Sequence, residues 1–178
     1  MRRKKASRPI LDLLASGEIH KGSSILDFGC GRGEDVKHLR KLGYKAKGYD
    51  PHKAFGYSRL PKGHYGVVTM TYVINVIPKM IDRVDTIWEA LSKVEHGGLL
   101  FIASRSRSEV EREAKKNRWL KDGAGYRTRA GTYQMGHSFR SLLELCRHPY
   151  LRSDVVEWRR LGGRQYTGIL LATRRWPR

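Results

Sequence analysis

Short apolar runs alternate along the chain with segments in which apolar residues recur every three or four positions. The runs have the length of buried strands, and the wider spacing is typical of one face of a helix. We expect strands at residues 24–28, 45–49, 66–72 and 99–103, and helices at residues 9–16, 34–42, 81–91, 105–121 and 139–146. Strands that alternate with helices predict an α/β fold with a mostly parallel sheet.

The last part of the chain predicts a different pairing. Two further strands, at residues 154–158 and 167–173, are joined across Gly162 and Gly163. This connection is too short for a helical crossover, so we expect an antiparallel terminal pair. The segment that ends at Gly136 is rich in glycine and predicts irregular structure.

Residues 52–62 contain two breaks at Pro or Gly and little periodicity, so we expect a loop there. A longer chain of this architecture would place a helix and a strand at this point. The sheet is therefore predicted to be trimmed after its second strand. In such sheets ligands bind beyond the carboxyl ends of the strands.

Charge adds a class of partner to this picture. The chain has 178 residues, the size of one domain, and its 36 Lys and Arg exceed its 17 Asp and Glu, which gives a net charge of +19. Such a charge attracts polyanions, so nucleic acid is the first expected partner. We assign residues 1–178 to one domain, with a basic, flexible tail at residues 1–8.

The location follows from what the sequence lacks. No apolar run is long enough for a membrane span or a signal-peptide core, so we expect no membrane partner and a cytoplasmic location. Two cysteines far apart, Cys30 and Cys146, fit a reducing compartment. The histidines show no zinc-ligand spacing, and we expect no metal.

A glycine-rich turn at residues 27–33, Asp-Phe-Gly-Cys-Gly-Arg-Gly, follows the first predicted strand. Glycines there let the backbone approach a ligand closely. The dinucleotide pattern would need a third glycine at position 34, which is Glu34, and a carboxylate at that helix start disfavours a pyrophosphate. The turn therefore favours a nucleoside that lacks phosphates.

Asp50 ends the second predicted strand, 17 positions after Gly33. An acidic side chain at this place can accept two hydrogen bonds from a ribose diol. The alternative is that Asp50 only starts the turn at Pro51. Coupled to the glycine-rich turn, the ribose role is the better interpretation. Asp27 also has an alternative role, as a partner of loop amides.

At residues 25–33, 48–51 and 67–78 the sequence resembles the class I S-adenosylmethionine-dependent methyltransferases, which have a Rossmann-like sheet. The resemblance implies that residues 29–33 pack against the methionine part of the cofactor and that Asp50 holds its ribose. It also implies that residues 72–75 line the adenine or the reaction side. The cofactor-binding residues expected on this basis are Asp27, Gly29, Cys30, Gly31, Gly33, Asp50 and Tyr72. The helix and strand missing after Asp50 depart from the full family pattern.

Residues 31–36, 72–77 and 131–134 are similar to the methyltransferases associated with DNA phosphorothioation systems. This narrower resemblance supports the same fold and cofactor. It also favours DNA as the target.

Three residues are candidates for the reaction itself: Tyr72, Asn75 and His137. Asn75 could bind a substrate amine or cap the following helix. His137 could accept a proton at the cleft, or it could be an ordinary surface or core histidine. The Asp/Asn-Pro-Pro-Tyr/Phe tetrad of many amino-group DNA methyltransferases is absent, and so is the Pro-Cys nucleophile of the cytosine C5 enzymes.

Basic residues are denser in the second part of the chain, where residues 105–178 carry 18 Lys and Arg against 7 Asp and Glu. The substrate-binding candidates are Arg105, Arg107, Arg127, Arg129 and Tyr133. The arginines could neutralise phosphates, and the tyrosine could stack on a base. For any one of these arginines, a solvated surface position is the simpler explanation.

The sequence thus predicts a single-domain methyltransferase that uses S-adenosylmethionine and acts on nucleic acid, with DNA favoured over RNA. One alternative is a non-catalytic nucleic-acid-binding subunit with a methyltransferase-like fold, which the short loop and the missing tetrad favour. Another is a methyltransferase of small molecules or proteins. A protein partner or a homodimer stays open under each reading.

Overall fold

The computed structural model describes residues 5–149, 155–162 and 166–173. The strands of its main sheet are β1 (Ser24–Phe28), β2 (Lys45–Tyr49), β3 (Tyr65–Thr71), β4 (Val94–Arg105), β8 (Val155–Gly162) and β9 (Tyr166–Thr173). The helices are α1 (Arg8–Ala15), α2 (Glu34–Lys41), α3 (Met80–Leu91), α4 (Arg107–Asn117) and α5 (Phe139–Cys146), with the short 3-10 turns η1 (Lys53–Phe55) and η2 (Ile74–Val76).

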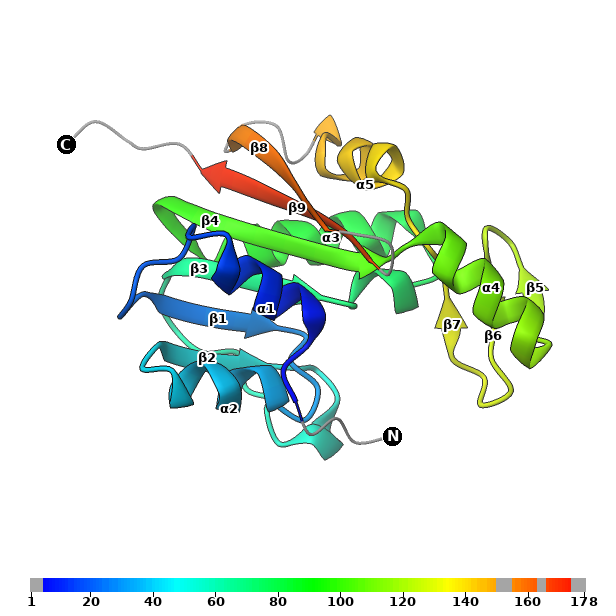
Figure 1. Cartoon of the computed structure of the whole chain (residues 1–178), viewed down its shortest axis with the longest axis horizontal. Helices are drawn as coiled ribbons and strands as arrows, with labels where there is room; N and C mark the ends of the chain where they lie inside the picture. The colour runs from blue at the N-terminus through cyan, green and yellow to red at the C-terminus, as the bar shows by residue number, and fades with distance from the viewer. Residues whose placement is uncertain (1–4, 150–154, 163–165, 174–178) are drawn as a thin grey trace.

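The main sheet has the strand order β2-β1-β3-β4-β9-β8 (Figure 1). Strands β1 to β4 pair in parallel, whereas β9 runs antiparallel to both β4 and β8. The predicted fold class and the antiparallel terminal pair are therefore confirmed. The trimming is confirmed too, because β2 is an edge strand and the chain between β2 and β3 contains only η1.

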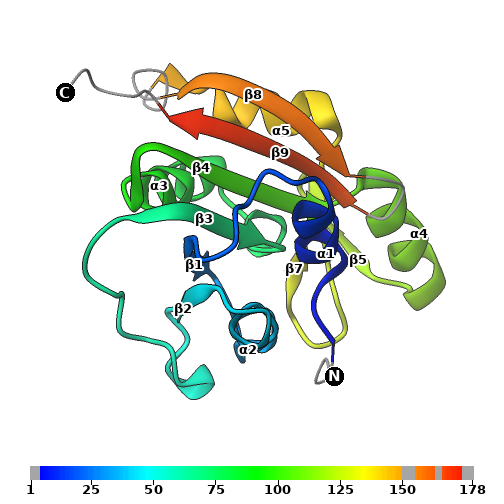
Figure 2. The same cartoon turned by 60° about the vertical axis from the view of Figure 1, so that its left-hand side comes forward.

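Helices cover the main sheet on both faces (Figures 1 and 2). On one face α1 and α2 bury residues such as Leu13 and Leu39 against Ile25 and Phe101. On the other face α3 and α5 pack on the opposite side chains of the same strands. This alternation of side chains is the period-two pattern of a strand that is buried on both faces.

A second, three-stranded antiparallel sheet stands where the sequence predicts irregular structure. It consists of β5 (Leu120–Asp122), β6 (Gly125–Arg127) and β7 (Tyr133–Gln134). The charge-rich helix expected at residues 105–121 is also shorter than predicted. Residues up to Arg105 extend β4, and Arg118 closes α4 in the left-handed conformation at φ 52°.

The described structure extends into the segment assigned to the basic tail. Ser7, assigned to the basic tail, donates its backbone N–H to Asp35 Oδ1 at 2.6 Å, and Arg8 is the first residue of α1. The Tyr166 hydroxyl donates to Asp12 Oδ2 at 2.8 Å and fixes α1 against β9. Residues 1–4 of the expected tail and residue 154 of the expected strand lie outside the described residues.

No helix in the described part of the chain combines the length and the apolar character that a membrane span requires.

Candidate functional site

The carboxyl ends of β1, β3 and β4 point to one edge of the main sheet, where α4 and the small sheet also lie (Figure 1). The glycine-rich turn begins at this edge. The backbone N–H groups of Gly29 and Cys30 both donate to the Tyr49 carbonyl, at 2.7 and 3.0 Å. Gly29 has φ +82°, and a Cβ there would collide with the Val73 side chain. Glycine is therefore required at this position by both conformation and space.

Asp50 holds the turn from the end of β2. Its Oδ2 accepts the Gly31 N–H and its Oδ1 accepts the His52 N–H, each at 2.9 Å. A carboxylate oxygen has two lone pairs, so both oxygens can accept a further hydrogen bond from a ligand hydroxyl. The structure thus places the predicted ribose-binding acid against the predicted binding turn.

Asp27 is buried beneath the turn, and its Oδ1 accepts the Thr69 hydroxyl of the neighbouring strand at 2.9 Å. This bond joins β1 to β3 under the site. Cys30 is buried as well. Burial, with Asp27 and Asp50 nearby, raises the pKa of its thiol to about 12, so the group stays protonated and serves as an apolar side chain.

Aromatic residues after β2 close the side of the turn, a feature that the sequence analysis missed. Tyr57 stands so close to Gly33 and Gly48 that a Cβ at either glycine would collide with it. Phe55 stacks on His52, and the Arg32 guanidinium lies 5.4 Å from its ring centroid. The sequence did contain a signal for this feature, namely the aromatic side chains within residues 52–57. The loop at residues 52–57 covers the side of the turn at which the helix and strand are missing after Asp50.

Tyr72, directly after β3, has φ +62°, which is rare for an aromatic residue. Its N–H donates to the Ala103 carbonyl at 2.7 Å, which anchors the strained backbone to β4. Strain of this kind costs about 1–3 kcal/mol and persists where the surroundings impose it, commonly at functional sites. Tyr72 lies at the strand end at which the reaction side was predicted.

Asn75 does not cap a helix, so that alternative is wrong. It is the middle residue of η2, is 1% exposed, and donates from Nδ2 to Gln134 Oε1 at 3.2 Å. Its carbonyl accepts the Met135 N–H at 2.8 Å. Gln134 belongs to the segment 131–134 of the narrower resemblance, but no local sequence pattern indicates that β7 reaches η2 and that this side chain contacts Asn75.

His137 is not a titrating residue in an open cleft, contrary to one sequence interpretation. It is 2% exposed, and its Nδ1 lies 2.7 Å from Ser104 Oγ. Burial lowers the pKa of His137 to about 4, and the positive charges of Arg83 and Arg107 act in the same direction. The imidazole is therefore neutral at physiological pH and is a weak base.

The five substrate-binding candidates divide into two groups. Arg105 pairs with Glu109 through two bonds of 2.9 and 3.2 Å, and Arg127 pairs with Asp122 at 2.6 Å. Tyr133 is 4% exposed, beneath the Arg127 guanidinium. In the structure Arg105 and Arg127 thus form ion pairs and Tyr133 is buried in the small sheet, and their contacts with phosphate or base stay predictions.

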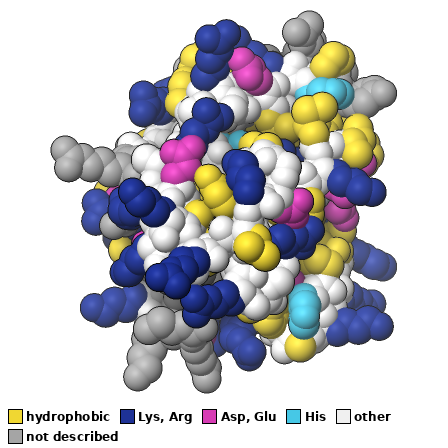
Figure 3. All heavy atoms as spheres, turned by 90° about the vertical axis from the view of Figure 1, so that its right-hand side faces the viewer, with side chains coloured by type: hydrophobic (Ala, Val, Ile, Leu, Met, Phe, Trp, Pro, Cys, Tyr) yellow, Lys and Arg dark blue, Asp and Glu magenta, His cyan; other side chains and the backbone are white. Residues whose placement is uncertain are grey.

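Arg107 and Arg129 form the second group, because both are exposed and neither forms an ion pair within the described residues. They belong to a region that we call the α4–β7 unit, residues 107–134, which carries eight Lys and Arg against four Asp and Glu. On this end of the molecule Lys and Arg side chains outnumber acidic ones (Figure 3). Its surface therefore presents a positive field beside the carboxyl edge.

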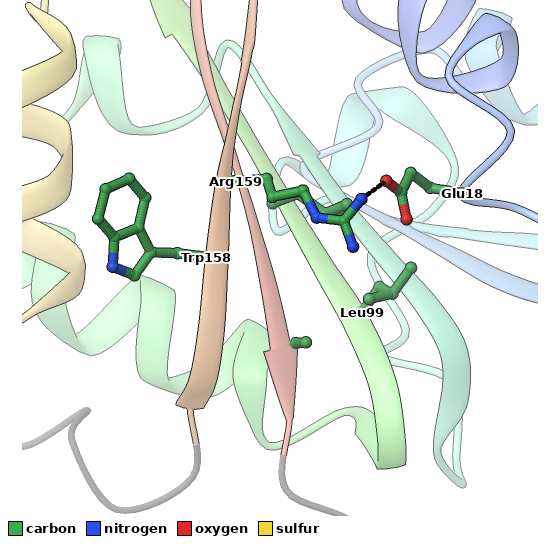
Figure 4. Close-up of a pocket in the computed structure, with 6 residues that line it drawn as sticks. Glu18, Leu99, Trp158 and Arg159 are labelled. Atoms are coloured by element: carbon green, nitrogen blue, oxygen red, sulfur yellow. Dashed lines mark hydrogen bonds and ion pairs between the residues drawn. The ribbon is translucent and has the colours of Figure 1, made fainter.

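A shallow pocket elsewhere on the sheet is not part of this site. It is lined by Leu99, Trp158 and Leu170 together with the ion pair of Glu18 and Arg159 (Figure 4). Leu99 pairs with Ala172 toward the amino side of β4, away from the carboxyl edge.

A family model described as a methyltransferase domain matches residues 1–145. The fold is similar to that of a SAM-dependent methyltransferase from Methanosarcina mazei, at 15% identity and TM-score 0.65, over 92% of this chain and 98% of that one. It is also similar to magnesium protoporphyrin IX methyltransferase from Synechocystis with SAH bound, at 18% identity and TM-score 0.59, over 93% and 80%. A protein of Pyrococcus horikoshii has 11% identity and TM-score 0.66, over 94% and 88%. No curated protein matches the sequence.

Proposed function

The chain belongs to the methyltransferase-domain family and is an S-adenosylmethionine-dependent methyltransferase, and from this premise we propose that its methyl acceptor is nucleic acid, with DNA favoured over RNA. The observation that supports this acceptor is the set of exposed cations on the α4–β7 unit. They are Arg107, Arg112, Lys115, Lys116, Arg118, Lys121 and Arg129, together with Arg127, which is exposed but paired with Asp122. They lie beside the edge at which the cofactor turn and Asn75 meet, so a phosphate backbone bound there would bring a base to that edge.

The residues of the carboxyl edge fit the cofactor. Asp50 would accept the ribose hydroxyls, the turn at residues 29–33 would pack against the methionine part, and residues 52–57 would wall the adenine side. When bound, S-adenosylmethionine supplies a methyl group on a positively charged sulfur. Transfer is an in-line displacement, so the protein contributes chiefly by positioning the acceptor.

His137 and Cys30, two buried titratable groups at this edge, offer no strong base. The pKa of His137 is lowered to about 4 and the thiol of Cys30 stays protonated. A methyl acceptor that loses its proton only after methylation can release that proton to water. The reaction therefore does not require a strong base.

A small-molecule acceptor is the second candidate, because the similar Synechocystis enzyme is named for a porphyrin substrate. The two candidates differ in what the α4–β7 unit must do. A nucleic acid would need its exposed cations, whereas a small acceptor would be insensitive to them.

Calorimetric titration with S-adenosylmethionine tests the cofactor half of the proposal. Wild-type protein should bind, and Asp50→Ala should weaken binding at least about tenfold through loss of about 1.4 kcal/mol or more. Asp85→Ala, an exposed carboxylate on α3, is the control and should bind as wild type. Absence of binding to the wild-type protein would favour a non-catalytic subunit.

Methyl transfer tests the acceptor half. The protein with methyl-tritiated S-adenosylmethionine should label unmodified DNA more than RNA. Cofactor binding without label in either nucleic acid would contradict the proposed acceptor and favour a small molecule.

A further inference from the structure

Asn75 carries a polar atom that the fold leaves unsatisfied. Its side chain is 1% exposed, and its Oδ1 has no hydrogen-bond partner among the described residues. An unpaired buried acceptor costs about 1–3 kcal/mol. Because none of the described protein groups satisfies this oxygen, its position calls for a functional explanation.

A chain of donors and acceptors sets the direction in which this oxygen points. The Glu109 carboxylate fixes the Arg105 guanidinium through two bonds, and Arg105 Nη1 lies 3.4 Å from Gln134 Oε1. A guanidinium only donates, so the atom that Gln134 turns toward Arg105 must be its oxygen. That same oxygen accepts Asn75 Nδ2–H at 3.2 Å.

The consequence is that Asn75 cannot be turned round without placing two amide oxygens face to face. Its Oδ1 therefore faces away from Gln134 and is available to accept a hydrogen bond. The backbone already ties β7 to η2 through Met135 N–H and the Asn75 carbonyl, at 2.8 Å. The backbone bond alone attaches β7 to η2. The hydrogen bond between the Gln134 and Asn75 side chains therefore serves to orient the Asn75 amide.

We propose that Gln134 is a positioning residue that fixes Asn75 so that its Oδ1 accepts an N–H of the amino group to be methylated. The inference rests on the proposed function and names the acceptor within it: the exocyclic amino nitrogen of a nucleobase. Tyr72 and Val73, directly before η2, are half-buried. A base that enters along this edge would contact these two partly exposed side chains.

The chemistry balances with this assignment. The amino nitrogen forms a bond to the methyl carbon as the bond from that carbon to sulfur breaks, and the electron pair of the broken bond stays on sulfur. The nitrogen becomes positively charged and loses one proton to water. Asn75 holds the other N–H, which keeps the nitrogen in line with the methyl group.

The test combines product identification with matched variants of the full chain. Gln134→Glu keeps an oxygen toward both Arg105 and Asn75, whereas Gln134→Met removes it at similar size. Thr86→Ala is the control, since that side chain lies on α3, outside the α4–β7 unit, and donates to the Asp82 carbonyl of the same helix. The probe is unmodified DNA of mixed sequence with methyl-tritiated S-adenosylmethionine, digested to nucleosides after reaction.

We expect the label on the amino nitrogen of adenine or cytosine. Gln134→Met should lower kcat/KM at least about tenfold, with unchanged cofactor Kd and a lower Tm because the buried Asn75 Nδ2–H loses its acceptor, while Gln134→Glu and Thr86→Ala stay within about threefold of wild type. Label on a ring carbon or ring nitrogen would overturn the inference and leave the proposed function standing. Equal activity of Gln134→Met and wild type would overturn it as well, and so would equal losses in both Gln134 variants.

If neither DNA nor RNA is labelled, the proposed function fails and the nucleobase amine fails with it, while NMR of the Asn75 side-chain amide still tests separately whether Gln134 orients Asn75. Its two proton signals, assigned by their loss in Asn75→Ala, should shift in Gln134→Met and persist in Gln134→Glu. Signals that are identical in wild type and Gln134→Met would show that Gln134 does not orient Asn75 and would overturn the inference.

Discussion

His137 links the protonation of one buried side chain to the stability of the fold. Burial lowers its pKa from 6.5 to about 4, so between these values the unfolded chain binds more protons than the folded one. The contribution to stability is complete above pH 6.5 and is lost as the pH falls toward 4. A shift of this size corresponds to about 3 kcal/mol.

We therefore expect the free energy of unfolding, measured in urea, to decrease between pH 7 and pH 4.5 in wild-type protein. His137→Gln should reduce this decrease by about 2–3 kcal/mol. His64→Gln, an exposed histidine, should leave it unchanged. A pH dependence that is the same in wild type and His137→Gln would contradict the assignment.

Arg83 shows how one element, the loop between η2 and α3, is held in place. This arginine is 6% exposed, and its Nε–H and Nη2–H donate to the carbonyls of Ile77 and Pro78, both at 2.7 Å. Within the described residues it pairs with no carboxylate. The two hydrogen bonds from the charged Arg83 side chain therefore hold the loop in place. The position of Asn75, just before this loop, depends on them as well.

Replacing Arg83 with methionine should lower the free energy of unfolding by about 2–4 kcal/mol, because two carbonyls lose charged donors. Arg40→Met is the matched control: Arg40 also donates from Nε to a backbone carbonyl, that of Ala46 at 2.8 Å, but it is exposed. We expect that control to lose less than about 1 kcal/mol. Equal losses in the two variants, measured by chemical denaturation, would contradict a special role for Arg83.

The elements differ in how far the sequence could predict them. Strands β1 and β2 and helix α5 were predicted at their observed bounds, because apolar periodicity and glycine or proline stops mark them. The small sheet was missed, since strands of two or three residues are too short for periodicity to show. Their pairing depends on contacts that only the folded chain makes.

The residues of the candidate site also differ in how far the sequence could predict their roles. Residues 29–33 and Asp50 are local features of a strand end, so the sequence could place them together. The roles of Arg105 and Arg127 depend on their ion pairs with Glu109, four positions along the chain, and with Asp122, on the neighbouring strand β5. A sequence shows that an arginine is present, but the partner that takes up its charge is a property of the structure.

At the scale of the whole molecule, charge and site lie at the same end. The carboxyl edge bears the turn for the cofactor, the strained Tyr72 and the oriented Asn75, and the α4–β7 unit adds exposed cations beside them. A net charge of +19 repels itself, and binding of a polyanion relieves that repulsion. Where on the surface the polyanion binds is a question that salt dependence can answer.

Binding of duplex DNA should weaken steeply with salt, because each neutralised phosphate releases counterions. If Arg107 and Arg129 each contact a phosphate, Arg107→Gln with Arg129→Gln should reduce the slope of log Kd against log salt by about 1.8. The control pair, Lys41→Gln with Lys45→Gln, removes the same charge from the amino side of the sheet and should change the slope by less than about 0.5. Equal reductions in the two pairs, measured by fluorescence anisotropy, would mean that DNA responds to total charge and that the α4–β7 unit is not its binding surface.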